Sequence, residues 1–447
     1  MKRQECDNSI GVVVWDVIKF IALGCLLIGA PVKATIHIIT NDSLPYVMTS
    51  GYAGDTVRIS GTKITTTGSG ISVGNATANV LFDLGNDTLE FGTDYGDSYY
   101  GINIDRSSAS NIAVRGGTIL HGVSNCGISG TDTAYNCRGI RIRGCNGLFL
   151  DSVNVIVGGF DATIVYTTGY QSYKNLEVRG GHYRHDGCGY TSREWKAEVF
   201  RLTYPSTSIS GDEYHFKAYG VHIDNAIHGA FSVLGLQFIY GCTVTVDARN
   251  DLYTYPDGNF LHGTTQSYAF SGGPWGGSEW HDNLVLTDSN YAGLDGGFIL
   301  GGVPVAYANE DTTLIYNNVV YGHRGLDTHY GYMNCKGVKS KGGNHRIRIY
   351  DNEFYLTVDT DSTELGGSNF RGNDALGVDW YAGVNGTVGR DTSVVFYNNY
   401  FEIRNVSVGG TVLAGGLRTR SDMGFSIGNE WYGNQIYSSG YIYSIGG

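Results

Sequence analysis

The chain has 447 residues, with 42 Asp and Glu against 30 Lys and Arg, and a formal net charge of −12. Nonspecific binding of nucleic acid needs a basic footprint, and the sequence contains no basic cluster, so it does not fit that class of protein. The 67 Gly and only 6 Pro favour many tight turns over a disordered linker. Apolar residues show no sustained helical spacing outside the N-terminus, which predicts an all-β fold.

The first 34 residues are predicted to be a secretory signal peptide. A basic start precedes an uncharged, mostly apolar run of 13 residues at 20–32, and Val32-Lys33-Ala34 offers a cleavage site with small residues. The run is too short to span a bilayer, although an uncleaved anchor is the alternative interpretation. Cleavage would leave residues 35–447 as one mature domain, secreted or at the cell surface, with no membrane span.

Six cysteines lie beyond residue 34, at positions 126, 137, 145, 188, 242 and 335. None forms a C-x-x-C pair, so the sequence does not indicate a zinc ribbon or a thioredoxin-like site. The first three are close enough in sequence for one local disulfide, for example between Cys126 and Cys145. The alternative is that most are buried as small apolar residues.

A repeated phrase predicts the architecture of the rest of the chain. In it, alternating apolar residues precede two small polar residues and then an apolar or aromatic one. Its copies lie at 313–319, 346–354, 394–401 and 425–431, and a related Val-Arg-Gly-Gly stands at 114–117 and 178–181. Asn318, Asn352 and Asn399 hold the same place in three copies and Asn429 marks the fourth, at spacings of 34, 47 and 30 residues. Such spacings indicate stacked coils that share one core, with the Asn side chains in a ladder.

Two stretches are less regular than the rest, at about 190–280 and 358–392. The first contains 204–208, 253–258 and 271–277, which are rich in Pro, Gly and Ser and are predicted to be long loops in the middle of the solenoid. Insertions on one face of a solenoid are often its binding face. The C-terminal residues offer no clear cap, so the coil ends are candidates for self-association.

The segment Gly54-Asp-Thr-Val-Arg-Ile-Ser-Gly-Thr-Lys-Ile, together with the Asn-rich phrases, resembles right-handed parallel β-helix proteins of the pectate-lyase-like superfamily. The resemblance covers about residues 40–447 and implies a single right-handed parallel β-helix over 35–447. Because the superfamily includes lyases, hydrolases, epimerases, esterases, adhesins and tailspikes, the fold alone does not give the activity. The Asp pair of polygalacturonases and the signatures of alginate epimerases and classical pectate lyases are absent from this sequence.

Nine of the twelve His lie between 182 and 329, and they suggest β-elimination on a uronic-acid glycan. That reaction needs a cation to neutralise the carboxylate, a base for the C5 proton and an acid for the leaving oxygen. The predicted catalytic residues are His228, Arg249, His262, His185 and Tyr253, with Tyr240 as an alternative acid. The predicted substrate-binding residues are His222, Arg184, His323 and Arg324, and Asp224, Asp247 and Asp251 are candidate calcium ligands.

Two functions fit these residues. The first is a secreted carbohydrate-active protein, a polysaccharide lyase that cleaves an acidic glycan, with calcium in place of Arg249 as a second option. The alternative is a non-catalytic surface, adhesive or filament-forming β-helix, in which the His and Asp side chains occupy turns and hydrogen-bonded ladders.

Overall fold

The computed structural model describes residues 34–48, 54–74, 78–94, 98–105, 109–122, 137–158, 163–167, 173–186, 198–202, 215–226, 229–246, 268–274, 276–287, 294, 296–300, 311–324, 335–340, 345–358, 375–381, 392–405, 414–420 and 430–439. The predicted signal peptide lies almost entirely outside these residues and stays a prediction. In the described ranges, no helix has both the length and the apolar character needed to cross a membrane.

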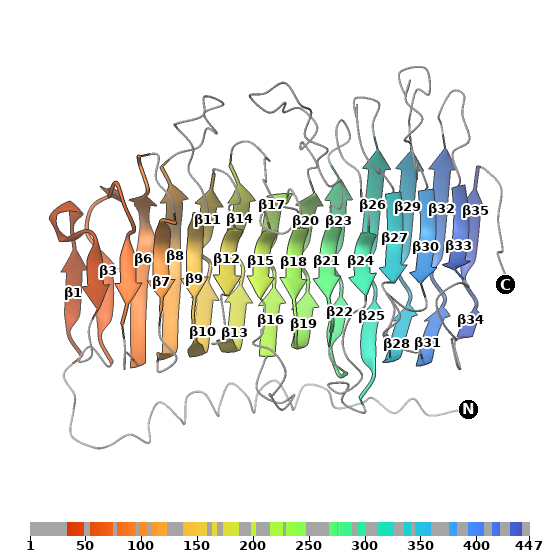
Figure 1. Ribbon diagram of the computed structural model, residues 1–447, viewed down its shortest axis with the longest axis horizontal. Coiled ribbons are helices and arrows are strands. Elements are labelled where there is room, and N and C mark those ends of the chain that lie inside the picture. The colour runs from red at the N-terminus through yellow and green to blue at the C-terminus, as the bar shows by residue number, and fades with distance from the viewer. Residues whose placement is uncertain are drawn as a thin grey trace, which may run out of the picture. The chain divides into compact units, whose positions relative to one another are not determined.

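The chain from Ile36 onward winds into coils of three parallel strands, so that each strand pairs with the equivalent strand of the next coil (Figure 1). The three columns of strands are here called faces A1, A2 and B; A1 and A2 belong to one sheet and B is a second sheet. Every pairing is parallel and nearly all are in continuous register. The predicted all-β parallel β-helix is thus confirmed.

Face A1 contains β1 (Ile36–Ile39), β3 (Thr56–Ile59), β6 (Ala78–Phe91), β8 (Ser110–His121), β10 (Cys145–Asp151), β13 (Tyr173–Arg179), β16 (His215–Tyr219), β19 (Leu236–Tyr240), β22 (Glu279–His281), β25 (Thr313–Tyr316), β28 (His345–Tyr350), β31 (Thr392–Tyr397) and β34 (Glu430–Tyr432). Face A2 contains β4 (Lys63–Thr65), the second halves of β6 and β8, β11 (Asn154–Val157), β14 (His182–His185), β17 (His222–Ala226), β20 (Thr243–Val246), β23 (Leu284–Thr287), β26 (Val319–Arg324), β29 (Glu353–Val358), β32 (Tyr400–Asn405) and β35 (Gln435–Ser438).

Face B contains β2 (Tyr46–Met48), β5 (Ile71–Val73), β7 (Tyr100–Ile104), β9 (Arg138–Ile142), β12 (Thr163–Thr167), β15 (Glu198–Leu202), β18 (Gly229–Val233), β21 (Tyr268–Gly272), β24 (Gly296–Leu300), β27 (Cys335–Ser340), β30 (Ala375–Tyr381) and β33 (Ala414–Arg420). A short 3-10 helix, η1 (Asn41–Ser43), joins β1 to β2. Of the three predicted middle loops, 204–208 and 253–258 lie outside the described residues and stay predictions. The prediction of a long loop at 271–277 was wrong, because β21 extends to Gly272 and β22 begins at Glu279.

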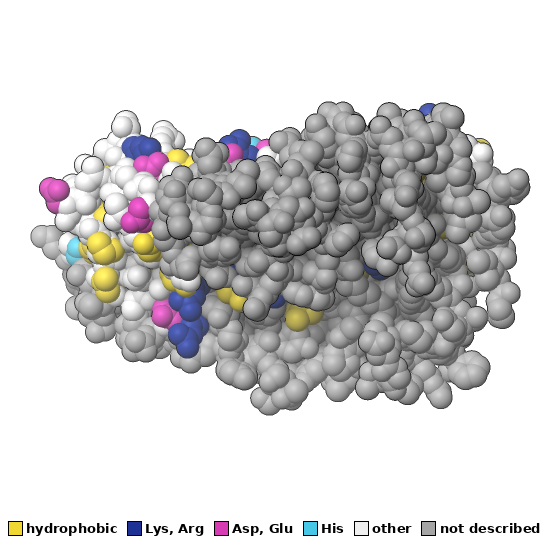
Figure 2. All heavy atoms as spheres, turned by 45° about the horizontal axis from the view of Figure 1, so that its top comes forward, with side chains coloured by type: hydrophobic (Ala, Val, Ile, Leu, Met, Phe, Trp, Pro, Cys, Tyr) yellow, Lys and Arg dark blue, Asp and Glu magenta, His cyan; other side chains and the backbone are white. Residues whose placement is uncertain are grey.

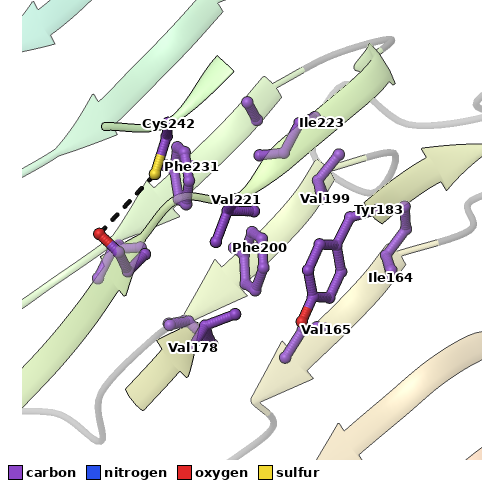
Figure 3. Close-up of a cluster of buried hydrophobic side chains, with 14 of the residues drawn as sticks. Ile164, Val165, Val178, Tyr183, Val199, Phe200, Val221, Ile223, Phe231 and Cys242 are labelled. Atoms are coloured by element: carbon purple, nitrogen blue, oxygen red, sulfur yellow. Dashed lines mark hydrogen bonds between the residues drawn. The ribbon is translucent and has the colours of Figure 1, made fainter. Parts of the chain in front are cut away.

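The interior of the coils is filled by columns of like apolar side chains. Phe200, Phe231, Phe270 and Phe298 stack on successive strands of face B, with ring centroids 5.2, 5.3 and 5.2 Å apart. Figure 3 shows the first two, with Phe200 beside Tyr183 of face A2. Aromatic pairs at this separation add to the free energy of burying their apolar area. The core is therefore continuous from coil to coil.

A buried ladder of Asn side chains crosses the turn between faces A1 and A2. Asn283, Asn318, Asn352, Asn399 and Asn434 follow one another, and each Nδ2 donates to the Oδ1 of the next at 2.8–2.9 Å. The same Oδ1 atoms accept from backbone N–H groups of the preceding coil, as in the bond from Asn283 N to Asn318 Oδ1 at 3.1 Å. The predicted ladder is confirmed for its first three members.

The ladder position after Asn399 is held by Asn434, so the prediction of Asn429 for that position was wrong. The register pairs Phe396 with Trp431 and Tyr397 with Tyr432, so the turn falls after Tyr432. Each ladder Asn follows a residue with positive φ, such as Asn398 at 57° or Gly433 at 66°. Glycine and Asn adopt that conformation most readily.

One outward column of the A1 strands changes chemistry along the solenoid. Its first members are Arg58, Asp83, Arg115, Asp151 and Arg179, which alternate in charge on neighbouring strands. Its later members are Tyr219, Tyr240, His281, Tyr316, Tyr350, Tyr397 and Tyr432, whose rings stack at 4.8–5.3 Å with interplanar angles of at most 9°. Because the rings from Tyr240 to Tyr397 are covered on both faces by their neighbours, they present mainly their edges to the outside, and the stacking supports the coil-to-coil pairing.

The described thiols form no disulfide with one another. Cys137, Cys145, Cys242 and Cys335 are all buried, and Cys126 lies outside the described residues, so a bridge from Cys126 stays a prediction. Burial raises the pKa of Cys145 and that of Cys242 to about 12, so both stay protonated. Their role is that of small apolar residues in the core.

Large apolar side chains are exposed at both ends of the described solenoid. They are Ile36, Ile38 and Val47 in the first coil and Tyr432 and Tyr437 in the last. Figure 2 shows hydrophobic side chains gathered at the end that the first coils form. Self-association through the coil ends stays a prediction.

Replacement of Asn318 tests the ladder. Asn318→Leu leaves the Trp280 carbonyl without its 2.9 Å donor and the Asn283 N–H without its acceptor, and both groups are buried. We expect a loss of about 2–4 kcal/mol in the free energy of unfolding, measured by urea denaturation. The matched control is Asn434→Leu, at the partly exposed end of the ladder, which should cost less than half as much; equal losses would contradict the ladder's contribution.

His121 predicts a pH dependence of stability. Its ring is 3% exposed and stacks on Phe91, and Nδ1 donates to the Gly158 carbonyl at 2.8 Å, whereas Nε2 has no partner among the described residues. Burial lowers the pKa of His121 to about 4, against the opposite effect of the Gly158 bond.

Because the folded pKa lies below the unfolded value, the unfolded chain binds the proton first, and stability falls as the pH drops from about 6.5 toward 4. At pH 4, His121 lowers the free energy of unfolding by on the order of 3 kcal/mol relative to its value above pH 6.5. Thermal unfolding at several pH values should show a smaller acid slope for His121→Gln than for the natural protein. His222→Gln, an exposed control, should keep the natural slope.

Candidate active site on face B

Half of the predicted site residues lie outside the described residues: His228, Arg249, His262, Tyr253, Asp247 and Asp251. The roles assigned to them stay predictions. Among the remainder, the structure places Arg184 and His185 on β14 and His222 and Asp224 on β17, two neighbouring strands of face A2.

The A2 residues divide between the surface and the core. Arg184 and Asp224 are register partners that point outward. Asp224, a predicted calcium ligand, forms an ion pair with His182. His185 points inward, is buried, and its Nδ1 lies 3.2 Å from the carbonyl oxygen of Asn225. The structure therefore brings together His222, Arg184 and Asp224 and separates His185 from them.

The other described candidates lie elsewhere. His323 and Arg324 are on β26, four strands along face A2 from β14, and the His323 N–H donates to Thr287 Oγ1 at 2.6 Å. Tyr240 is on face A1, stacked between Tyr219 and His281. Within the described ranges, no group of three or more His, Cys, Asp or Glu side chains is close enough to hold a metal ion. Calcium binding stays a prediction that depends mainly on Asp247 and Asp251.

A different set of ionisable side chains meets on face B. In β15, Val199, Phe200 and Leu202 fill the core, so Glu198 and Arg201 lie on the outer side. The neighbouring strands contribute Arg141 and Tyr166 on one side and Ser232 on the other, in the same register row as Arg201. Alternation of the strand residues thus places a polar row along the outside of this sheet.

Glu198, Tyr268 and Arg201 form the centre of this group. The Tyr268 hydroxyl donates a short hydrogen bond to Glu198 Oε1, and Arg201 Nε lies 3.3 Å from Glu198 Oε2. The two partners in the short bond are 3% and 5% exposed. Tyr268 is on β21 and Glu198 on β15, with β18 between them.

Gly229 makes this contact across two strands possible. A Cβ atom at residue 229 would lie 2.3 Å from Cε2 and 2.5 Å from Cζ of Tyr268. The Tyr268 ring therefore lies flat over Gly229 on its way to Glu198. Any side chain at residue 229 would displace the ring.

The surroundings fix the protonation of Tyr268. Burial and the Glu198 carboxylate raise the pKa of Tyr268 well above its usual range, so its hydroxyl is neutral and can donate a proton. The site therefore holds a neutral donor beside a carboxylate acceptor.

Arginine and aromatic side chains flank the pair on the N-terminal side. Arg138 lies over the Tyr166 ring at 4.8 Å and Arg201 over the same ring at 5.8 Å. One strand earlier, Arg141 lies over Tyr100 at 4.7 Å. On the C-terminal side, buried Lys336 pairs with Asp379 at 2.8 Å. This part of an acidic protein is locally rich in cations.

Sequence reasoning missed Glu198, Arg201, Tyr268 and Arg138. Clusters of His and Asp along the sequence do not point to them, because Glu198 and Tyr268 are 70 residues apart. A signal was present in the strand patterns Arg138-Gly-Ile-Arg-Ile and Glu198-Val-Phe-Arg-Leu. Both place two charged residues on the outside of an otherwise apolar strand.

No family model and no curated protein matches the chain. The solved structures that are similar to it include the A-modules of the mannuronan C-5 epimerases AlgE6 and AlgE4 from Azotobacter vinelandii. Each is 12% identical to this chain. The matches cover 86% and 88% of this chain and 91% of each solved chain, with TM-scores of 0.36 and 0.32. At this level of similarity the match carries no argument about activity, and the fold rests on the strand pairing.

Gly229→Ala tests the geometry of the centre. The added methyl group forces the Tyr268 ring away from Glu198, and we expect a loss of about 1–3 kcal/mol in unfolding free energy. Gly68→Ala is the matched control, because its Cβ would meet only Tyr99 at 3.8 Å. A Gly229→Ala protein as stable as the control would show that the ring does not cross at this point.

Proposed function

We propose that the protein is a carbohydrate-active enzyme that cleaves an acidic polysaccharide by β-elimination on face B. The observation that carries the proposal is the buried Tyr268–Glu198–Arg201 group beside Arg138 and Tyr166. A neutral proton donor, a carboxylate and arginines at one point are the groups that this reaction needs.

The arginines supply the binding of the substrate. A uronic-acid carboxylate is planar and accepts two parallel hydrogen bonds from a guanidinium, which gives Arg a geometric advantage over Lys. Arg201 is 23% exposed in its side chain and is the cation of the group that a ligand reaches most directly. Neutralising the carboxylate stabilises the negative charge that develops on the sugar when the C5 proton leaves.

Glu198 and Tyr268 supply the proton transfers. The Glu198 carboxylate takes the C5 proton, and the electron pair of that C–H bond forms the C4–C5 double bond as the C4–O4 bond breaks. The Tyr268 hydroxyl gives its proton to the departing O4. The proton on Glu198 then returns to the tyrosinate across their hydrogen bond, so atoms and charge balance over one turnover.

The predictions from sequence enter this proposal in two ways. The signal peptide predicted at 1–34 supports action outside the cell or at its surface, where polysaccharides are found. His228, His262, Arg249 and Tyr253 remain candidate contributors to base or acid chemistry, and calcium on Asp247 and Asp251 remains an alternative to arginine for binding the carboxylate.

A specific observation favours the non-catalytic alternative as the second candidate. Several described His side chains already have intramolecular partners: His182 with Asp224, His281 with Asp282, and His185 with Asn225. The stacked rings on face A1 are likewise partnered within the protein. An adhesive or filament-forming β-helix would need nothing more from these residues.

The test is an assay on uronic-acid polysaccharides. We expect the purified protein, incubated with a panel of such polymers with and without calcium, to produce the ultraviolet absorbance of an unsaturated uronate and new reducing ends. Glu198→Gln and Tyr268→Phe should each lower turnover by about a hundredfold or more, since each removes one proton-transfer group. Tyr355→Phe is the matched control: its hydroxyl donates to Glu353 at 2.8 Å on face A2, and turnover should not change.

Solvent deuterium separates the two steps. In D2O, exchange at C5 without cleavage would show that a base removes the C5 proton and that elimination fails afterwards, which would overturn the role assigned to Tyr268. Neither exchange nor cleavage with any polymer of the panel would favour the adhesive alternative.

A further inference from the structure

A cavity of about 450 Å³ opens on the outer side of face A1. It is lined by residues of four neighbouring strands, β13, β16, β19 and β22: Asn175, Leu176, Glu177, His215, Lys217, Phe238, Tyr240, Glu279 and His281. Its volume lies within the range of small-molecule sites. The cavity shares no residue with the group on face B. Its lining includes Tyr240 and His281 of the stacked column, and its other residues belong neither to that column nor to the proposed reaction.

The strand register sets the side chains of the cavity in a row. Glu177 is beside Lys217, Lys217 beside Phe238, and Phe238 beside Glu279. The row therefore has one carboxylate at each end, with the Lys217 ammonium group and the Phe238 ring between them. This row runs along the solenoid, parallel to the stacked aromatic column.

Phe238 differs from the aromatic residues of that column. Gln237 and Ile239 are buried, so Phe238 points outward into the cavity. No other aromatic ring in the described ranges stacks on it, whereas Tyr240, two residues later, is covered on both faces by Tyr219 and His281. The Phe238 ring is thus an apolar platform with polar groups at its edges, the composition typical of a ligand site.

The two carboxylates are held in place by tyrosines. Glu177 Oε1 accepts the Tyr219 hydroxyl at 2.9 Å, and Glu279 Oε2 accepts the Tyr316 hydroxyl at 3.4 Å. The second oxygen of each carboxylate has no hydrogen-bond partner among the described residues. These two oxygens are free to accept hydrogen bonds from a ligand that carries hydroxyl groups.

We propose that this cavity binds a neutral sugar residue, which stacks on Phe238 and donates hydroxyl hydrogen bonds to Glu177 and Glu279. The two carboxylates oppose an anionic ligand, and one Lys does not reverse their charge. The ligand class therefore differs from the acidic glycan proposed for face B. The proposal does not rest on that activity.

The test uses saturation-transfer NMR and titration calorimetry on the full chain. The probes are neutral oligosaccharides of glucose, mannose and galactose and, for comparison, an oligouronate. We expect one neutral series to bind with a Kd of about 1 mM or below. Phe238→Ala should weaken that binding at least about tenfold, as expected for the loss of a buried aromatic contact, and Glu177→Gln with Glu279→Gln should weaken it as well.

Two further variants control the result. Leu314→Ala changes the next residue of the same row, beside Glu279 and outside the cavity, and should leave Kd unchanged. Phe238→Leu keeps the apolar bulk without the ring and serves where Phe238→Ala folds poorly; it should also weaken binding. Absence of binding by every neutral probe, preference for the oligouronate, or a Kd unaffected by either Phe238 variant would overturn the proposal.

Discussion

The structure depends on the parallel, in-register pairing of each coil with the next. This pairing repeats a residue position at a spacing of about 4.8 Å, so a side chain meets its equivalent above and below rather than a random neighbour. Like side chains then stabilise one another in columns: Phe on Phe in the core and Asn on Asn at the turn. Outside, Arg alternates with Asp and Tyr stacks on Tyr.

The columns also explain how a low proportion of charged residues suffices for this fold. The Asn ladder satisfies buried polar groups without charge, because each amide both donates and accepts along the same line. In the charge alternation from Arg58 to Arg179 the Arg side chains are about half exposed, and ion pairs this accessible to water contribute little each. The buried amides and rings therefore determine the register more strongly than the ion pairs.

The sequence reveals those parts of the structure that repeat. Asn318, Asn352 and Asn399 are recognisable because they recur in one phrase and occupy one place in the coil. Asn429 was misleading because its phrase resembles the repeat, whereas the register is set by the positive-φ residue Gly433.

The candidate site could not be found in the same way. The distance between successive turn positions varies from 21 residues, between Val221 and Cys242, to 47, between Asn352 and Asn399. Which distant residues meet therefore depends on the length of every connection between them. Glu198 and Tyr268 come together only because two coils of particular length separate them and Gly229 leaves room for the ring. By contrast, the sequence cluster around 182–224 falls on face A2, where alternation directs His185 inward and Arg184 outward.

The most direct measurement is a crystal structure of the Tyr268→Phe protein with a bound oligouronate. The account predicts a substrate carboxylate in hydrogen-bonding contact with the Arg201 guanidinium and the sugar C5 facing the Glu198 carboxylate. An oligouronate bound on face A1 or A2, with Arg201 still engaged only by the protein, would contradict it.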